Sequence, residues 1–277
     1  RVHTTATMAT LFPIIVAIGA PASTLRSPIQ QRPLLHGHAQ STRPAVQANL
    51  LADVLVPRGV PRDSKAIRSQ AIAGVRAALR SKRDSFWEVE FPPLQQLNKL
   101  GDGSARSARE VDQVNCQFAA ELSQNAGRAT VLVACGSAQE AELGKRARGA
   151  TIISVREAQQ AVQPGKVAII VSPSDTSHWA AAQALAESGR PSVVVNAFTN
   201  HGYGGCQHAF YLKPITAYGA VAGTVLKRHP GPYECFDAVG KLVPSVKVPI
   251  ARQGRLATPD LRAAQLYCQD KFMKKKQ

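Results

Sequence analysis

The side chains best suited to chemistry gather in one glycine-rich stretch, residues 190–210 (RPSVVVNAFTNHGYGGCQHAF). An apolar run ends at Asn196, and the loop that follows holds His201, Cys206 and His208. Ligands of α/β proteins bind beyond the carboxyl ends of parallel strands. These four residues are therefore the candidate ligand-binding residues of the chain.

A metal site is the first chemistry to test, because imidazole and thiolate groups both bind zinc. The spacing of His201, Cys206 and His208 is H-x4-C-x-H, which matches no standard zinc signature. A fourth ligand would have to come from elsewhere, such as His178 or His229. A glycine-rich loop with solvated histidines explains the same residues, so we expect no metal and no cofactor.

Nucleotide binding and nucleophilic catalysis have weaker support. The Gly-Lys pairs lack the other residues of a phosphate-binding P-loop, and no G-x-G-x-x-G opens a helix. Ser174, Asp175 and His178 lie close together after an apolar run, but residues adjacent in sequence rarely form a catalytic triad. An N-terminal cap on the next helix, from Ser174 or Asp175, accounts for the same pattern.

Composition divides the chain into a leader and a folded part. The 277 residues have a net charge of +16, and residues 1–48 hold four arginines and no Asp or Glu. This composition is typical of an organelle transit peptide, with mitochondrial and secretory leaders as alternatives. We expect a plastid leader over residues 1–48 and a single α/β domain over residues 49–277. Without the four leader arginines the charge is +12, which favours acidic partners.

One predicted helix near residues 63–84 concentrates this charge. Its apolar residues recur at helical spacing, and its basic residues lie on the other side; the basic set is Lys65, Arg76, Arg80 and Arg83. A solvated helix face explains these residues equally well. No aromatic residues interleave them, which argues against nucleic acid as the partner.

The central part of the chain predicts a parallel sheet. Four short β-branched runs, at residues 128–135, 150–155, 166–173 and 190–198, are almost wholly apolar and are separated by helical segments. Strands of this kind are buried on both faces, as in a Rossmann-like sheet covered by helices. An earlier strand, SFWEVEFPP, ends at two prolines.

The flanking segments complete the predicted fold. A long helix is expected to begin at a capping box formed by Ser107 and Glu110 and to end at Gly127. Beyond residue 205, β-type runs joined by Pro and Gly turns predict an antiparallel meander. A helix beginning near Pro259 closes the domain. The fold class is α/β: a mostly parallel sheet with helices on both faces, extended by the meander and the closing helix.

Three segments together resemble one family. WEVEFPP at 87–93, GRPSVVVNAF at 189–198 and FYLKPITAYGAVAGTVLKRHPGPYECF at 210–236 are similar to the plant, algal and cyanobacterial domain-of-unknown-function family nineteen ninety-five. Where this family often has Trp after its Pro-Gly turn, the chain has Tyr233. The positions that fit the family's recurrent motifs are Glu90, Pro92, Asn196, Pro230 and Gly231.

The resemblance implies a stromal or thylakoid-associated protein, because the family contains the low photosystem II accumulation 3 protein; it carries over no catalytic residue. We therefore expect a non-enzymatic accessory protein in the chloroplast stroma or on the stromal face of the thylakoid. Its expected partners are photosystem subunits or membrane-insertion factors, with peripheral contact to the thylakoid membrane. The alternative is an enzyme module that binds a nucleotide or phosphate ligand at residues 196–208.

Overall fold

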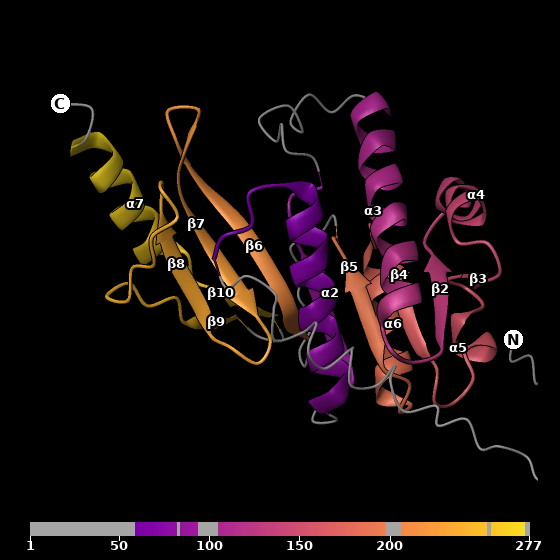
Figure 1. Cartoon of the computed structure of the whole chain (residues 1–277). Coiled ribbons are helices and arrows are strands. Elements are labelled where there is room, and N and C mark those ends of the chain that lie inside the picture. Colours follow the sequence, from indigo (N-terminus) through magenta and orange to yellow (C-terminus); the bar gives the residue numbers. More distant parts are fainter. Residues whose placement is uncertain (1–58, 82–83, 94–104, 198–205, 254–255, 275–277) are drawn as a thin grey trace, which may run out of the picture. The chain divides into compact units, whose positions relative to one another are not determined.

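The computed structural model describes residues 59–81, 84–93, 105–197, 206–253 and 256–274 (Figure 1). The chain divides into two units, residues 1–44 and 45–277, and every described element belongs to the second. In chain order these are α2 (Ser64–Ser81), β1 (Phe86–Glu90), α3 (Ala105–Asn125), β2 (Thr130–Ala134), α4 (Ser137–Arg146), β3 (Thr151–Ser154), α5 (Ala158–Ala161), β4 (Val167–Val171), α6 (Thr176–Glu187), β5 (Ser192–Val195), β6 (Gln207–Ala217), β7 (Ala220–Arg228), β8 (Tyr233–Asp237), β9 (Ile250–Gln253), β10 (Leu256–Pro259) and α7 (Arg262–Lys274).

An eight-stranded sheet organises the second unit, with the strand order β3-β2-β4-β5-β1-β6-β7-β8. Neighbouring strands from β3 to β6 are parallel, and β7 and β8 add to them in antiparallel pairs. This arrangement confirms the predicted α/β class and its antiparallel extension. The strand from the SFWEVEFPP segment, β1, lies between β5 and β6 near the middle of the sheet.

Three of the four predicted core strands are buried as expected, and the fourth is not. Every residue of β4 and β5 is buried, as are the last four of β2. In β3, Thr151 is exposed and the isoleucines at 152 and 153 are only half-buried. The prediction of burial on both faces is wrong for β3, because it pairs with β2 alone and forms the edge of the sheet.

The C-terminal half differs from the predicted meander in two places. β6 was expected to be antiparallel to its neighbours, but it pairs with β1 in parallel, so the change of direction comes one strand later, at β7. After β8 the next strand, β9, does not join the meander, because it pairs with β10 in a separate two-stranded sheet. The closing helix is confirmed as α7, and it packs on β6 and β7.

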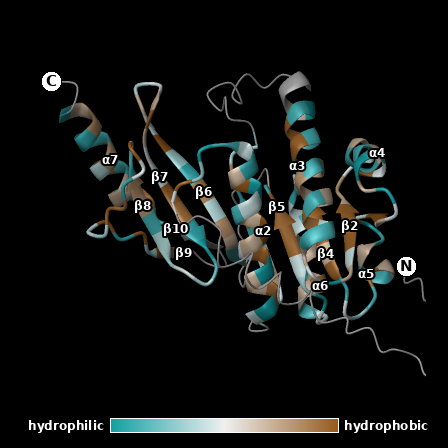
Figure 2. Cartoon of the chain, viewed as in Figure 1, coloured by the Kyte–Doolittle hydropathy of each residue, from teal (hydrophilic) through white to brown (hydrophobic). Residues whose placement is uncertain are grey.

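Helices cover both faces of the sheet, and the hydrophobic strands lie between them (Figure 2). On one face α2, α3 and α4 enclose a core that contains Trp87, Val89, Phe118 and Phe210. On the other face α6 packs on β1, β4 and β5, with Trp179 against Phe86. α7 lies on this second face as well, over the strands at the other end of the sheet. None of the helices in the described part of the chain combines the length and the apolar composition needed to cross a membrane.

The basic helix forms as α2, and its predicted apolar face is buried; those residues are Ile67, Ala71, Val75 and Ala78. Gly74 is required on this face, since a Cβ there would lie 2.6 Å from the carbonyl oxygen of Ala209. On the outer side Lys65 and Arg80 are exposed, whereas Arg76 is half-buried. Arg83 lies outside the described residues.

The long helix α3 begins before its predicted cap. Its first residue is Ala105, so Ser107 lies inside the helix and the capping-box prediction is wrong. An S-x-x-E spacing also occurs along a helix face, because residues i and i+3 are neighbours there, and it does not fix a helix start by itself. The predicted stop is in place: Gly127 has a φ of 71°, a left-handed conformation that suits glycine after a helix.

Candidate functional site

The central position of β1 buries one carboxylate, that of Glu88, and half-buries another, that of Glu90. Successive side chains of a strand point to opposite faces, so Trp87 and Val89 enter the core under α2 and α3 while Glu88 and Glu90 point to the other face. Glu88 is only 7% exposed. β5 and β6 pair with β1 on its two sides, so β1 lies inside the sheet and not at its exposed edge.

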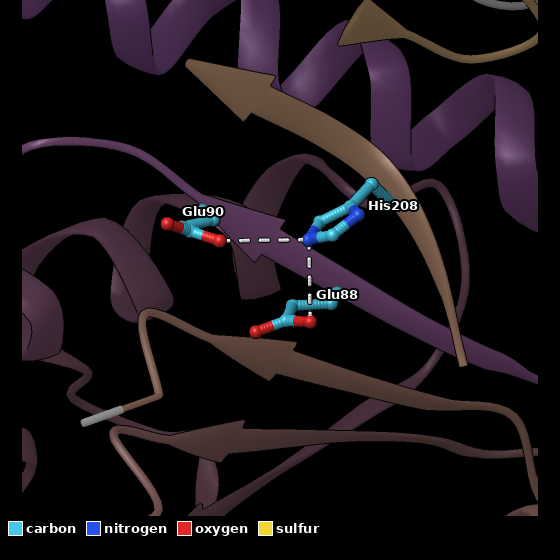
Figure 3. A group of neighbouring side chains, drawn as sticks. All are labelled: Glu88, Glu90 and His208. Atoms are coloured by element: carbon cyan, nitrogen blue, oxygen red, sulfur yellow. Dashed lines mark ion pairs between the residues drawn. The ribbon is translucent and has the colours of Figure 1, made fainter. Parts of the chain in front are cut away.

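The register of β6 brings a histidine to the same place. His208 is the partner of Glu88 in the parallel pairing of β1 and β6. A bulge then shifts the register between Glu88 and Val89, which places Tyr211 opposite Glu90. His208 is 8% exposed, and its ring points toward both carboxylates (Figure 3).

The three side chains meet at one atom, the Nε2 nitrogen of His208. It lies 3.3 Å from Oε2 of Glu88 and 3.6 Å from Oε2 of Glu90 (Figure 3). The other carboxylate oxygen of Glu90 lies 3.4 Å from Nζ of Lys213. The other ring nitrogen of His208, Nδ1, is 2.7 Å from the hydroxyl oxygen of Tyr233. We call Glu88, Glu90 and His208 the Glu–Glu–His cluster.

The two ring nitrogens of His208 differ in how well they are satisfied. Nδ1 has the short hydrogen bond with Tyr233. Nε2 is buried, and no group in the described part of the chain meets it with hydrogen-bond geometry, although two carboxylates are close. Buried polar atoms in proteins are nearly always hydrogen-bonded, so this nitrogen needs an explanation.

Charge explains part of the arrangement. Burial alone would lower the pKa of His208, but the Glu88 and Glu90 carboxylates outweigh it and raise the pKa to about 9. For Glu90, burial would raise the pKa, and the neighbouring His208 and Lys213 cations reverse this and leave it below its ordinary value. The lowered pKa of Glu90 and the raised pKa of His208 therefore keep the Glu90 carboxylate and the His208 ring charged at neutral pH.

Two tyrosines, Tyr211 and Tyr233, line the cluster on the side of α7. The rings of Tyr211 and Tyr233 meet edge-on with centroids 5.5 Å apart, and the His208 ring is 4.8 Å from that of Tyr211. Burial raises the pKa of both phenols, so both keep their protons. Cys206, just before β6, is also close to Glu88, and burial raises the pKa of its thiol well above the ordinary value.

Asn196, the first candidate of the glycine-rich stretch, has a different role. It adopts a φ of 44° directly after β5, and its Oδ1 accepts a 2.8 Å hydrogen bond from the backbone N–H of Phe91. Its Nδ2 donates to Oδ1 of Asn115 at 2.7 Å, and Nδ2 of Asn115 donates to Oγ of Ser172 at 2.6 Å. This Asn196 network connects the ends of β5, β1 and β4 with α3. Both polar atoms of the Asn196 side chain, Oδ1 and Nδ2, are engaged in it.

The remaining candidates lie apart from one another or lie outside the residues that the structure describes. The metal set weighed from sequence was His201, Cys206 and His208. Of these, His208 joins Glu88 and Glu90 instead, and Cys206 contributes no ligand atom to that group. His201 lies outside the described residues. At the next strand end, Asp175 caps α6 as predicted, with Oδ1 accepting from the backbone N–H groups of Ser177 and His178.

Sequence reasoning named His208 and Glu90 but missed Glu88. Its signal was present in the E-x-E pattern of residues 88–90, since alternate residues of a strand share one face. Of the other motif positions, Pro92 lies two residues after the last residue of β1. Pro230 and Gly231 lie in the turn between β7 and β8, where the Gly231 N–H donates to the carbonyl oxygen of Arg228 at 2.6 Å.

Comparison with protein families places these residues in a known context. Residues 61–248, more than half of the chain, match the family model described as Domain of unknown function (DUF1995). The chain belongs to this family. No curated protein and no solved structure matches the chain significantly. The matched range of this family includes the Glu–Glu–His cluster, the Asn196 network and α2.

Proposed function

We propose that this protein is a non-enzymatic accessory protein of the chloroplast, a photosystem assembly or thylakoid-associated scaffold factor that holds acidic protein or membrane surfaces. Membership of the family supports the role, and the acid-free composition of residues 1–48 supports the compartment. The partners we expect are photosystem subunits or membrane-insertion factors.

The observation that carries this proposal is the basic exterior. Residues 49–277 have a net charge of +12, and the outer side of α2 presents Lys65 and Arg80 to solvent, with Arg62 exposed just before the helix. Arg68 on the same helix is already paired with Glu121 at 2.8 Å. A positive surface of this kind attracts acidic proteins and anionic lipid headgroups, and the attraction is screened by salt.

Co-sedimentation of the protein with isolated thylakoids tests the proposal. The bound fraction should fall steeply as salt rises from about 0.05 to 0.3 M, because the Debye length shrinks across this range. The double variant Lys65→Glu/Arg80→Glu should bind less than wild type at every salt concentration. Arg156→Glu, an exposed change on the loop before α5, is the control for charge alone and should bind more tightly than the double variant.

Two results would contradict the proposal. Binding that stays constant across the salt series would exclude a charge-driven contact. Equal loss in Arg156→Glu and in a Lys65→Glu single variant would show that net charge acts without any particular surface. The compartment is tested separately, by following a fluorescent fusion to residues 1–48, which should enter plastids.

The alternative, a module that binds a nucleotide or phosphate at residues 196–208, has less support. The Asn196 amide is used in structural hydrogen bonds. The Glu88 and Glu90 carboxylates beside His208 would repel an anionic phosphate. An unchanged melting temperature on addition of nucleotides or inorganic phosphate would argue against this alternative.

A further inference from the structure

We propose that the Glu–Glu–His cluster binds a divalent metal ion and that Zn²⁺ is the ion it prefers. The ligand atoms are one oxygen each from Glu88 and Glu90 and the Nε2 nitrogen of His208, which all lie within 4.8 Å of one another. The proposal is independent of the scaffold role, because it concerns the covered face of β1 and β6 and not the basic exterior.

Two of the three distances within the cluster match those of a small tetrahedral centre, and the third, between the two carboxylate oxygens, lies within 4.8 Å. Zinc binds carboxylate oxygen and imidazole nitrogen at about 2.0–2.2 Å, and tetrahedral angles then separate ligand atoms by about 3.3–3.6 Å. The two distances from Nε2 of His208, to the Glu88 and Glu90 oxygens, are 3.3 and 3.6 Å. An octahedral Mg²⁺ site needs neighbouring ligands closer together, at about 3.0 Å.

The hydrogen-bonding state of His208 fits a ligand better than an ordinary core residue. Its Nε2 is more than nine-tenths buried with the rest of the side chain, is aimed at two carboxylates and has no hydrogen bond in the described part of the chain. Its Nδ1 is held by the Tyr233 hydroxyl at 2.7 Å. Metal-binding histidines typically donate the second ring N–H to such an oxygen, which fixes the ring and directs the other lone pair at the ion.

The charges of the cluster and its access from solvent also favour a bound metal ion. The buried Glu88 carboxylate needs positive charge beside it, and a divalent ion bound to a neutral imidazole would supply that charge in place of the imidazolium. Lys213 engages only Oε1 of Glu90, which leaves Oε2 for the ion. The Glu90 side chain is 27% exposed and so offers a route from solvent.

The ligand types also favour zinc over the common hard cations. An imidazole ligand suits Zn²⁺, whereas Mg²⁺ and Ca²⁺ select oxygen ligands. Three protein ligands leave one tetrahedral position open, which is the arrangement of zinc sites that bind an exchangeable water or a small ligand. The site would therefore hold an ion that remains accessible to a fourth, external ligand.

Titration of the chelator-treated full chain with Zn²⁺ against a chromogenic competitor tests the proposal. We expect one tight site per chain. Glu88→Gln, Glu90→Gln and His208→Gln should each weaken the dissociation constant by more than about 100-fold, and Tyr233→Phe by about ten-fold, since outer partners contribute that much. Mg²⁺ at equal concentration should not compete. Co²⁺ bound in place of zinc should give the intense visible absorption of a tetrahedral site, and His208→Gln should abolish it.

His178→Gln is the matched control. Its imidazole also lies 3.3 Å from a carboxylate, that of Asp175, at the start of α6, and the pair belongs to no three-ligand group among the described residues. This variant should bind zinc like wild type. Circular dichroism and a urea midpoint for each variant separate lost binding from lost folding, and the near-isosteric Glu88→Gln change is the one expected to fold normally. Absence of a tight site, or zinc binding unaltered in folded Glu88→Gln and His208→Gln, would overturn the proposal.

Discussion

Two buried polar groups lie on neighbouring central strands, and they are built differently. The Asn196 network faces α3, and its hydrogen bonds to Phe91, Asn115 and onward to Ser172 measure 2.6–2.8 Å. The Glu–Glu–His cluster lies on the opposite face of the sheet, with its carboxylates 3.3 and 3.6 Å from a nitrogen that has no hydrogen bond in the described part of the chain.

This difference separates a structural group from a binding group. A network whose members satisfy one another stabilises the fold, because each buried amide and N–H has exchanged water for a protein partner. A group whose central atom has ion pairs but no well-aligned hydrogen bond gains less stability from its contacts, and that atom can bind a ligand instead. The two groups should therefore respond oppositely to mutation and to metal.

The largest effect is expected from Asn196→Ala. The change leaves the Phe91 N–H and the Oδ1 atom of Asn115 without these partners and puts alanine at a φ of 44°. Each unsatisfied buried group costs about 1–3 kcal/mol and the left-handed conformation about 1 kcal/mol, so the free energy of unfolding should fall by roughly 4 kcal/mol. Urea denaturation measures it. Asn125→Ala, which removes an exposed side-chain hydrogen bond to Glu121, should cost less than about 1 kcal/mol.

The second-largest effect is expected from zinc, which should raise the free energy of unfolding through the Glu–Glu–His cluster and not through the Asn196 network. At a concentration about 100 times its dissociation constant, an ion that binds only the folded state raises the free energy of unfolding by about 2.7 kcal/mol. Wild type should show this increase and lose it on addition of chelator, and His208→Gln should show none. Ser172→Ala, a change within the Asn196 network, should keep the full increase. A gain that survives in His208→Gln would mean that the ion binds elsewhere.

Ser172 allows a smaller test within the network. Ser172→Ala removes the acceptor for Nδ2 of Asn115 and should cost about 1–2 kcal/mol in the free energy of unfolding. Ser172→Gly removes the same acceptor but relieves the φ of 45°, which returns about 1 kcal/mol, so glycine should be the less damaging change. Thermal or urea unfolding measures both changes: no loss in Ser172→Ala would refute the role given to the hydroxyl, and the reverse order of alanine and glycine would refute the strain given to the backbone.

The smallest effect is expected at Glu88 in the ion-free protein. Glu88→Gln removes a buried charge together with its desolvation cost, keeps the shape and leaves Glu90 to balance His208, so the free energy of unfolding should change by less than about 1 kcal/mol. Glu121→Gln, which weakens the partly exposed pair with Arg68, is the matched control and should behave similarly. A loss of more than about 3 kcal/mol in Glu88→Gln would mark the cluster as a structural ion pair of the buried kind.

Local patterns predicted much of the fold, and their failures share a cause. The apolar runs of β2, β4 and β5, the buried face of α2 and the cap at Asp175 were correct, because each depends on residues close together in sequence. The burial of β3 and the pairing of β6 were wrong, because edge position and pairing partner depend on distant segments. The capping box at Ser107 was wrong because the same spacing also occurs inside a helix.

The sequence by itself determined that this protein folds as helices around a parallel sheet, and that Glu88 and Glu90 share one face of their strand. Only the tertiary structure decided that β1 enters the middle of the sheet between β5 and β6, which buries Glu88, half-buries Glu90 and sets His208 opposite Glu88. The alternation of a strand fixes which face a side chain points to, but it carries no information about which distant strand becomes the neighbour or in what register.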